Sequence, residues 1–216
     1  MTRAAGEGCR EEDPAAGEDA RPKPGHGADV TPKCVPVPWL ESRAGSSLSG
    51  MDADFIERSR TFTWDDPVPP LAASRDLDGL SFIRAMIAGD YPPPPIAQTL
   101  NFWLVSADPG VAVFECEPGE YHYNPLGMIH GGLACTLLDS VVGCAGHTTL
   151  PAGVGYTSID LNVSYLRPIL ATTGTLRAVG RVVKGGQRVI FAEGELTDAA
   201  GTVLATATSS LLVLRP

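Results

Sequence analysis

Residues 124–140 read Asn-Pro-Leu-Gly-Met-Ile-His-Gly-Gly-Leu-Ala-Cys-Thr-Leu-Leu-Asp-Ser, and this stretch decides the fold. Small and aliphatic residues fill 133–145, a composition typical of a helix buried nearly all round. His130, Gly131 and Gly132 lie at its predicted N-terminus, where backbone N–H groups lack partners within the helix. That end carries a partial positive charge, so the N–H of Gly131, together with that of Gly132, could cradle a carbonyl oxygen that becomes an oxyanion.

Asp139 is the only charged residue in the apolar run 133–145. A carboxylate in such a helix needs a partner, a shifted pKa or a chemical role. A solvent-facing helix carboxylate is the alternative interpretation. We take Asp139 as the first catalytic candidate.

Strand patterns surround this helix. Before it, two runs flank the turn Ala107-Asp108-Pro109-Gly110, and after it come four runs rich in Val and Thr. Gly185-Gly186 and Asp198-Ala199-Ala200-Gly201 separate the last three runs, as tight loops do between sequential antiparallel strands. The predicted fold is therefore α+β, with one long helix against about six antiparallel strands, near 99–106, 111–117, 155–166, 173–183, 188–197 and 202–213.

The motif and its surroundings resemble the hotdog-fold acyl-CoA thioesterases of the phenylacetate-pathway (PaaI-like) type. In that family an Asn lies six residues before the His of a His-Gly-Gly and an acidic residue follows that His by nine, as Asn124, His130 and Asp139 do here. The run 156–168, Tyr-Thr-Ser-Ile-Asp-Leu-Asn-Val-Ser-Tyr-Leu-Arg-Pro, resembles the family's first strand after the helix. The resemblance covers about residues 95–214. It implies a hotdog fold, in which the sheet wraps around one central helix, and hydrolysis of acyl-CoA thioesters.

The resemblance assigns hypothetical roles to the matched residues. Asp139 would attack the thioester, either as a nucleophile or as a general base on water. Asn124 would hold the water or the thioester, although a residue that merely forms the turn before Pro125 is the alternative. His130 is either a structural hydrogen-bonding residue that holds the loop or a proton shuttle. Ser158 matches the strand hydroxyl that orients the acid or the water.

Candidate residues for binding the substrate and its coenzyme A lie around this set. Alternation along a strand lets only one of Thr157 and Ser158 face the site, and we choose Ser158. Basic side chains concentrate in the last third of the chain and suit a phosphate-bearing tail, although ordinary solvated surface is the alternative. The binding candidates are Gly132, Thr157, Arg167, Lys184 and Arg188, and the acyl pocket is expected near Leu133, Leu137, Val141 and the segment 91–103.

No cofactor is predicted, because coenzyme A is part of the substrate. No metal is predicted either, since His122 and His147 have no companion ligands at metal-binding spacing.

The spacing of the motif predicts more than one copy of the chain. His130 and Asp139 lie about 13 Å apart along a helix that rises about 1.5 Å per residue. One thioester cannot contact both within one chain. A two-fold dimer with antiparallel helices would bring the end of one helix to the middle of the other. We therefore expect a homodimer or a dimer of dimers, an arrangement that the resemblance also implies.

Composition excludes several classes of partner. The formal net charge is −9, which argues against a broad nucleic-acid or anionic-membrane surface. The five cysteines show neither a disulfide framework nor a zinc spacing, so we expect a reducing, cytoplasmic location. Cys135 and Cys144 are expected to behave as small buried apolar residues. No apolar run is long enough to predict a membrane span.

The composition of the sequence divides the chain into three predicted regions. Residues 1–60 are rich in Gly, Pro, Ala and charge, and are predicted to be disordered or weakly ordered. Residues 61–95 are expected to hold an amphipathic helix, with Asp76 as its cap and Gly89 as its end, and a proline-rich connector. Residues 96–216 form the predicted hotdog thioesterase domain. Because family-like sequence begins near Met51, we also expect translation to start there naturally.

Two other functions remain open. A non-catalytic acyl-CoA-binding protein would share the fold, although no output domain is visible in the first 75 residues. A hotdog dehydratase or hydratase is less favoured, because its His–acid pair is placed differently. The sequence does not decide between aromatic and short- or medium-chain acyl groups, since a few methylenes change preference only modestly.

Overall fold

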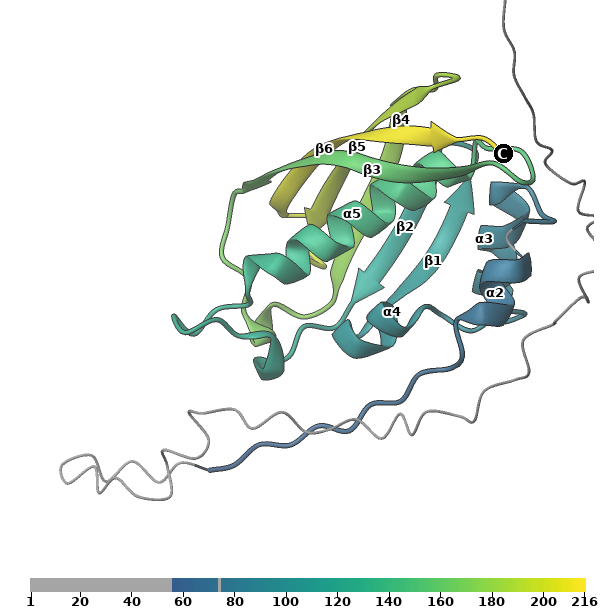
Figure 1. Cartoon of the computed structure of the whole chain (residues 1–216). Coiled ribbons are helices and arrows are strands. Elements are labelled where there is room, and N and C mark those ends of the chain that lie inside the picture. Colours follow the sequence, from purple (N-terminus) through teal and green to yellow (C-terminus); the bar gives the residue numbers. More distant parts are fainter. Residues whose placement is uncertain (1–55, 74) are drawn as a thin grey trace, which may run out of the picture. The chain divides into compact units, whose positions relative to one another are not determined.

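The computed structural model describes residues 56–73 and 75–216, and the architecture below is that of Arg58–Pro216 (Figure 1). No helix in this described part is long and apolar enough to cross a membrane. The predicted disorder of residues 1–60 and the expected start at Met51 fall almost wholly outside the described residues. The helices are α2 (Val68–Ala73), α3 (Gly79–Ala88), α4 (Pro95–Leu100) and α5 (Gly131–His147), and the strands are β1 (Phe102–Asp108), β2 (Val111–Cys116), β3 (Gly155–Tyr165), β4 (Leu176–Lys184), β5 (Val189–Thr197) and β6 (Val203–Leu214).

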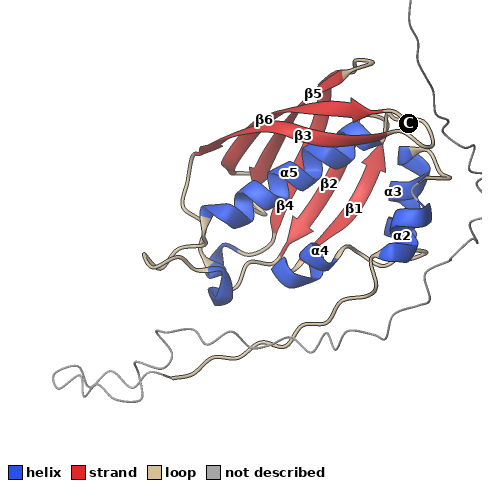
Figure 2. Cartoon of the chain, viewed as in Figure 1, coloured by secondary structure: helices blue, strands red, loops and turns tan. Residues whose placement is uncertain are grey.

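All six strands form one antiparallel sheet in the order β1-β2-β4-β5-β6-β3 (Figure 2). Consecutive strands are joined by tight turns where the sequence predicts them. Gly110 and Gly201 take φ values of 76° and 81° in two of these turns, a region that favours glycine. The strand β3 lies at one edge of the sheet and pairs only with β6. The predicted fold class is confirmed, and four of the six strands both begin and end within one residue of their predicted bounds.

The helix α5 packs on one side of the sheet and supplies the centre of the core (Figure 1). A Cβ atom at Gly180 of β4 would overlap the backbone oxygen of Val141, so this glycine lets helix and strand approach closely. One side of α5 is fully covered by the sheet. Its buried residues are Leu133, Ala134, Leu137, Leu138, Val141, Val142, Gly143, Ala145 and Gly146.

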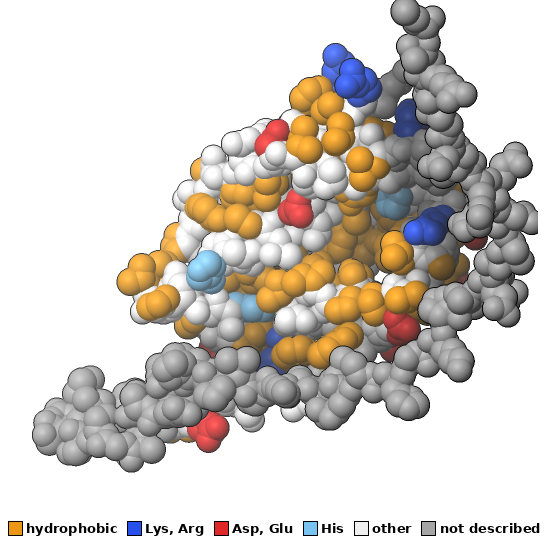
Figure 3. Space-filling view, viewed as in Figure 1, with side chains coloured by type: hydrophobic (Ala, Val, Ile, Leu, Met, Phe, Trp, Pro, Cys, Tyr) orange, Lys and Arg blue, Asp and Glu red, His pale blue; other side chains and the backbone are white. Residues whose placement is uncertain are grey.

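The opposite side of α5 is open in the single chain, so the expectation of a helix buried nearly all round is wrong for one protomer. Gly132 and Asp139 are exposed, and Cys135, Thr136 and Ser140 are half-buried. These residues recur at helical spacing and form one stripe. Seen from this side, the surface carries many hydrophobic side chains (Figure 3).

The helix predicted near 76–89 is present as α3, but its cap is Asp78 rather than Asp76. The Asp78 carboxylate accepts hydrogen bonds from the backbone N–H of Ser81 at 3.0 Å and from its hydroxyl at 2.6 Å. Both bonds lower the pKa of Asp78. Gly89 ends the helix in the left-handed region, with φ 85°, as predicted. Sequence alone did not separate two aspartates that are both good caps.

A short helix replaces the start of the first predicted strand. The strand expected from Thr99 begins at Phe102, because α4 occupies Pro95–Leu100. Pro95 stands at the first helical position, where its fixed φ is favourable, and Asn101 ends the helix in the left-handed region with φ 57°. The connector that precedes α4 is therefore one proline shorter than predicted.

The segment before α2 contacts the hotdog domain through two arginines. Arg58 forms an ion pair with Glu120 at 2.8 Å. The guanidinium of Arg60 lies 3.9 Å from the ring centre of Tyr121 and donates a hydrogen bond to the backbone oxygen of Thr99. A cation over an aromatic face contributes modest stability at exposed sites. These contacts tie residues 58–60 to the surface near α4.

Candidate active site

The N-terminus of α5 is capped by its own histidine. His130 has extended backbone angles, φ −61° and ψ 135°, and its Nδ1 accepts a hydrogen bond from the N–H of Gly132 at 2.8 Å. An accepting Nδ1 is unprotonated, so the ring proton of neutral His130 lies on Nε2. The geometry matches the predicted structural role of His130. It also occupies the Gly132 N–H, so Gly131 supplies the N–H that has no partner among the described residues.

Tyr165 of β3 supports this turn from the side. Its hydroxyl donates to the backbone oxygen of Gly131 at 3.2 Å and lies 2.8 Å from Sγ of Cys135. The contact with Cys135, followed by partial burial, raises the pKa of Tyr165 to about 12. The phenol therefore stays neutral and can donate. A Cβ at Gly131 would lie 2.9 Å from the Tyr165 ring, so the two residues are closely fitted.

Asn124 lies in the loop before α5 and shapes that loop. Its Oδ1 accepts from the backbone N–H of Leu126 at 2.8 Å and of Met128 at 3.3 Å. This is the turn role left open by the sequence. Asn124 still lines the same cavity as His130, Gly131 and Arg167, a hollow of about 500 Å³. Its side-chain amide nitrogen has no hydrogen bond to the described residues.

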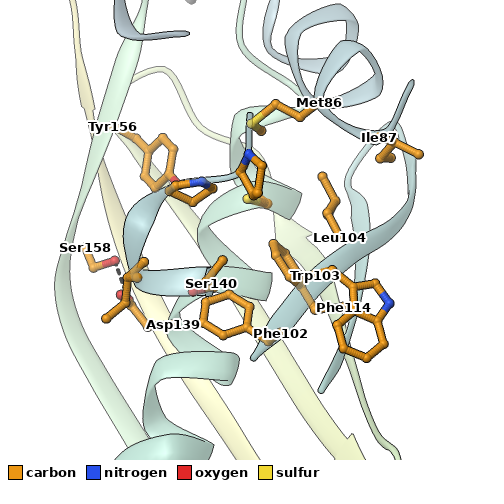
Figure 4. Close-up of a pocket in the computed structure, with 15 residues that line it drawn as sticks. Met86, Ile87, Phe102, Trp103, Leu104, Phe114, Asp139, Ser140, Tyr156 and Ser158 are labelled. Carbon is orange, nitrogen blue, oxygen red and sulfur yellow. Dashed lines mark hydrogen bonds between the residues drawn. The ribbon is translucent and has the colours of Figure 1, made fainter. Parts of the chain in front are cut away.

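The second part of the candidate site is centred on Asp139. Ser158 donates a hydrogen bond from its hydroxyl to Oδ1 of Asp139 at 2.8 Å (Figure 4). Ser158 reaches α5 because its side chain leaves β3 on the helix side. The neighbouring Thr157 faces the opposite side, as strand alternation requires. The structure does not bring Thr157 to the site.

An apolar cavity of about 440 Å³ opens beside Asp139. Figure 4 shows Asp139 and Ser158 at one end of it and Met86 and Ile87 at the other. Its size falls in the usual range for ligand pockets. The walls come from α3, the proline-rich connector, α4, β1, β2, β3 and α5, and the lining residues are Met86, Ile87, Pro93, Pro94, Ile96, Ala97, Phe102, Trp103, Leu104, Phe114, Asp139, Ser140, Cys144, Tyr156 and Ser158.

The expected pocket is correct for part of the segment 91–103 and wrong for the three helix residues. Leu133, Leu137 and Val141 are buried against the sheet and do not line the cavity. The α5 residues that line the cavity are Asp139, Ser140 and Cys144, which lie on a different side of the helix.

The other titratable groups beside the cavity are kept neutral. Burial raises the pKa of the Cys144 thiol to about 12, with a further contribution from Asp139. Burial likewise raises the pKa of Tyr156 well above its ordinary value. Desolvation lowers the pKa of His147, a neighbour of Tyr156. A neutral thiol is a poor nucleophile, so Cys144 behaves as the apolar residue that the sequence predicts.

The two halves lie apart within one chain. Asp139 and Ser158 line the apolar cavity, whereas Asn124, His130, Gly131 and Gly132 line the other one. Asp139 lies nine positions after His130, about 13 Å along the helix at 1.5 Å per residue. We call these two groups half-sites: a thioester bound at one of them cannot also touch the other within the same protomer.

The basic residues predicted to bind coenzyme A also lie in two separate places. Arg167 lines the cavity at the N-terminus of α5 and donates to the backbone oxygen of Val203 at 3.1 Å. Lys184 and Arg188 flank the β4–β5 turn, where the backbone oxygen of Arg188 accepts from Val213. These points lie at opposite ends of β6, about 30 Å apart for a strand of this length. The structure does not bring the three cations together in one chain.

Several residues near the two half-sites were not predicted. Tyr165 and Tyr156 both lie on β3, and Met86 forms part of the apolar cavity. Tyr156 and Tyr165 stand in the quoted strand 156–168, but sequence does not show which way each ring points. Met86 was assigned only to an amphipathic helix, and its contact with the cavity depends on how α3 packs.

No three His, Cys, Asp or Glu side chains among the described residues are grouped so that they could hold a metal ion. The site is built from a carboxylate, hydroxyls, backbone N–H groups and apolar walls. This fold and site define a hotdog protein with an acid–hydroxyl pair on the open side of its central helix.

Comparison with known proteins identifies the family to which the chain belongs. Residues 126–205 match the family model described as the thioesterase superfamily. Acyl-coenzyme A thioesterase 13 of Homo sapiens is 36% identical over 98 residues, which cover 45% of this chain and 68% of that protein. The chain belongs to the thioesterase superfamily, and the PaaI-like resemblance is confirmed.

Solved structures show the same fold. A phenylacetic acid degradation-related protein from Ralstonia eutropha JMP134 superposes with a TM-score of 0.56 at 31% identity, over 60% of this chain and 98% of that one. The PaaI protein of the E. coli phenylacetic acid degradation operon superposes with a TM-score of 0.55 at 21% identity, over 64% of this chain and 96% of that one. At that identity the second comparison supports the hotdog fold alone.

Proposed function

We propose that this protein hydrolyses acyl-CoA thioesters to the free acid and coenzyme A. Membership of the thioesterase superfamily and the similarity to a protein named acyl-coenzyme A thioesterase support this reaction class. The observation that carries the proposal is the Ser158–Asp139 hydrogen bond at the mouth of an apolar cavity. A carboxylate held beside a space for an acyl group suits attack on a thioester carbonyl.

The proposed chemistry is a net hydrolysis. A water oxygen is added to the carbonyl carbon, the carbon–sulfur bond breaks, and the thiolate of coenzyme A takes up a proton. Asp139 either removes the proton from the attacking water or forms a mixed anhydride that water then cleaves. The Gly131 N–H at the helix N-terminus would stabilise the oxyanion. Ser158 would hold Asp139 in position.

We further propose that each working site is shared between two copies of the chain. Each protomer carries an acid half and an oxyanion half that are too far apart to act together. The strand β3 leaves one edge unpaired within the described chain, and Ile159 and Tyr165 on it are each 56% exposed. An exposed apolar strand edge favours pairing with another strand. A two-fold axis beside β3 would set the two α5 helices antiparallel and bring unlike halves together.

Coenzyme A would bind at the oxyanion half, where Arg167 lies beside His130. An arginine there suits a phosphate group. Lys184 and Arg188 would contribute only from the far end of the sheet, that is, from the partner in an antiparallel dimer. Charge reversal at Arg167 should raise KM more than it lowers kcat, and reversal at Lys184 or Arg188 should do so only if the partner brings these residues to the shared site.

The remaining proposals follow from composition. We propose a cytoplasmic protein that needs no cofactor beyond the coenzyme A of its substrate. Its net charge of −9 disfavours nucleic-acid partners.

The test is release of free thiol from a panel of acyl-CoAs, with Asp139→Asn as the diagnostic variant. Loss of a general base or nucleophile should lower kcat by about 10²- to 10⁴-fold. Glu193→Gln is the matched control, because Glu193 is an exposed carboxylate on β5 that lies outside the apolar cavity. If the wild type binds acyl-CoA without releasing thiol, the protein is the non-catalytic binding protein instead.

A further inference from the structure

A second apolar cavity, of about 380 Å³, lies directly beyond the first. Its walls come partly from Pro67, just before α2, from Pro70 and Leu71 of α2, and from Phe82 and Ile83 of α3. None of these five residues belongs to the segment 126–205 that matches the family model. Cys144, His147 and Tyr156, which do belong to that segment, also line the cavity.

The two cavities share one wall. Five residues line both of them: Met86, Pro93, Pro94, Cys144 and Tyr156. In Figure 4, Met86 lies at the end of the first cavity that is away from Asp139 and Ser158, whereas Tyr156 lies on the same strand as Ser158. A chain that enters past Asp139 would therefore reach Met86 at the far end.

Only one member of the wall has a long, flexible side chain. The proline rings are fixed by their own backbone. The Tyr156 ring packs against His147, with ring centres 5.5 Å apart, and its hydroxyl is so close to Gly143 that a Cβ there would lie 2.6 Å away. Cys144 is short and belongs to α5. Met86 is half-buried, and its unbranched thioether can change rotamer and fill or vacate space at little cost.

We propose that Met86 divides a two-chamber acyl channel and determines the acyl chain length that this enzyme accepts. Medium-length acyl groups end in the first cavity, whereas long straight chains displace the Met86 side chain and continue into the second. The proposal rests on the proposed thioesterase function and deepens it. Both chambers are lined mostly by apolar side chains, so each added methylene gains burial on passing the divider.

The test is the ratio of kcat/KM for palmitoyl-CoA to kcat/KM for octanoyl-CoA, measured in the full chain. Met86→Trp should close the divider and lower this ratio about tenfold or more, since pocket contacts with a single methylene are already worth about tenfold. Met86→Ala should open it and raise the ratio. Ile87→Trp is the matched control, because Ile87 lines only the first cavity and should lower both rates with little change in the ratio.

The outcomes separate the two proposals. Hydrolysis with the same ratio in wild type, Met86→Trp and Met86→Ala overturns the role of Met86 and leaves the thioesterase function standing. Absence of hydrolysis with every acyl-CoA overturns the thioesterase function itself. If Met86→Trp unfolds, as a lowered melting temperature would reveal, Met86→Ala decides alone, and an unchanged or lowered ratio contradicts the proposal.

Discussion

The N-terminal turn and the middle of α5 belong to the same helix, yet they present opposite chemistry. The N-terminal turn offers a Gly131 N–H that is unpaired within the described part of the chain, a capping histidine and a nearby arginine, in a cavity of about 500 Å³. The middle offers a carboxylate with a serine partner and an apolar cavity of about 440 Å³. The first suits an oxyanion and a phosphate, and the second suits an attacking group and an acyl chain.

The difference between these two regions shows that the candidate groups of one active site can be distributed along a single helix. Under the proposed mechanism neither half completes the reaction within one chain, because the helix holds the two about 13 Å apart. Two copies related by a two-fold axis would form two complete sites. In such an interface the oxyanion half of each copy lies against the acid half of the other. Substitutions confined to one half should therefore impair the reaction in distinguishable ways.

The strongest test of the oxyanion half is Gly131→Pro, which removes one N–H. Proline is favoured at the first helical position, and His130 with ψ 135° already has the backbone that must precede proline. We expect kcat to fall about 10²- to 10³-fold, the usual cost of losing one oxyanion donor. Gly131→Ala is the control, because it adds the same Cβ beside Tyr165 and keeps the N–H. Equal losses in both variants would show that crowding, and not the N–H, matters.

The acid half is tested by Ser158→Ala, which leaves Asp139 without its hydroxyl donor. A hydrogen bond to a charged group contributes about 1.5–3 kcal/mol, so we expect kcat to fall about 10- to 100-fold. Thr157→Ala changes the neighbouring hydroxyl on the opposite face of β3 and should have little effect. A larger loss for Thr157→Ala than for Ser158→Ala would contradict the assignment of the strand face.

A smaller effect is expected for Tyr165→Phe, which removes the donor to the Gly131 oxygen. One neutral hydrogen bond contributes about 1 kcal/mol, so kcat should fall about fivefold. The double variant Gly131→Ala/Tyr165→Phe should then lose less kcat than the product of the fold-losses of the two single variants. Independent, multiplying losses would argue that Tyr165 does not act through this turn.

The smallest effect concerns stability in acid. His122 is buried, its Nδ1 accepts from the Gly119 N–H, and its Nε2 has no hydrogen-bond partner among the described residues. Burial, followed by repulsion from Arg60, lowers the pKa of His122 below the ordinary 6.5. The unfolded chain then binds the proton more readily, so the stabilisation is complete above about pH 6.5 and is lost as the pH falls below it. His122→Asn should flatten the decline of the melting temperature below pH 6.5, and an unchanged decline would contradict this account.

Much of the domain could be predicted from sequence because its elements have strong local patterns. The run 133–145 is long and apolar enough to identify α5, and turn residues such as Gly110 and Gly201 mark the strand ends. The short helices α2 and α4 could not be predicted in this way. Six residues do not establish a helical period, and such helices depend on packing more than on intrinsic preference.

The site was predictable as a set of residues and less so as a set of contacts. The spacing of Asn124, His130 and Asp139 identified the region, and strand alternation correctly chose Ser158 over Thr157 as the residue that faces α5. The capture of the Gly132 N–H by His130 depends on local dihedral angles that sequence does not reveal. The cavity walls depend on how the N-terminal helices pack, which no local pattern encodes.

Subunit complementation tests the shared site most directly. Gly131→Pro damages the oxyanion half and Asp139→Asn the acid half, so each variant alone should be nearly inactive. When the two chains are unfolded and refolded together in equal amounts, half of the dimers are mixed and each mixed dimer holds one intact site. The account predicts recovery to about a quarter of wild-type activity. A mixture that contains mixed dimers, verified by two affinity tags, and stays as inactive as its separate components would contradict it.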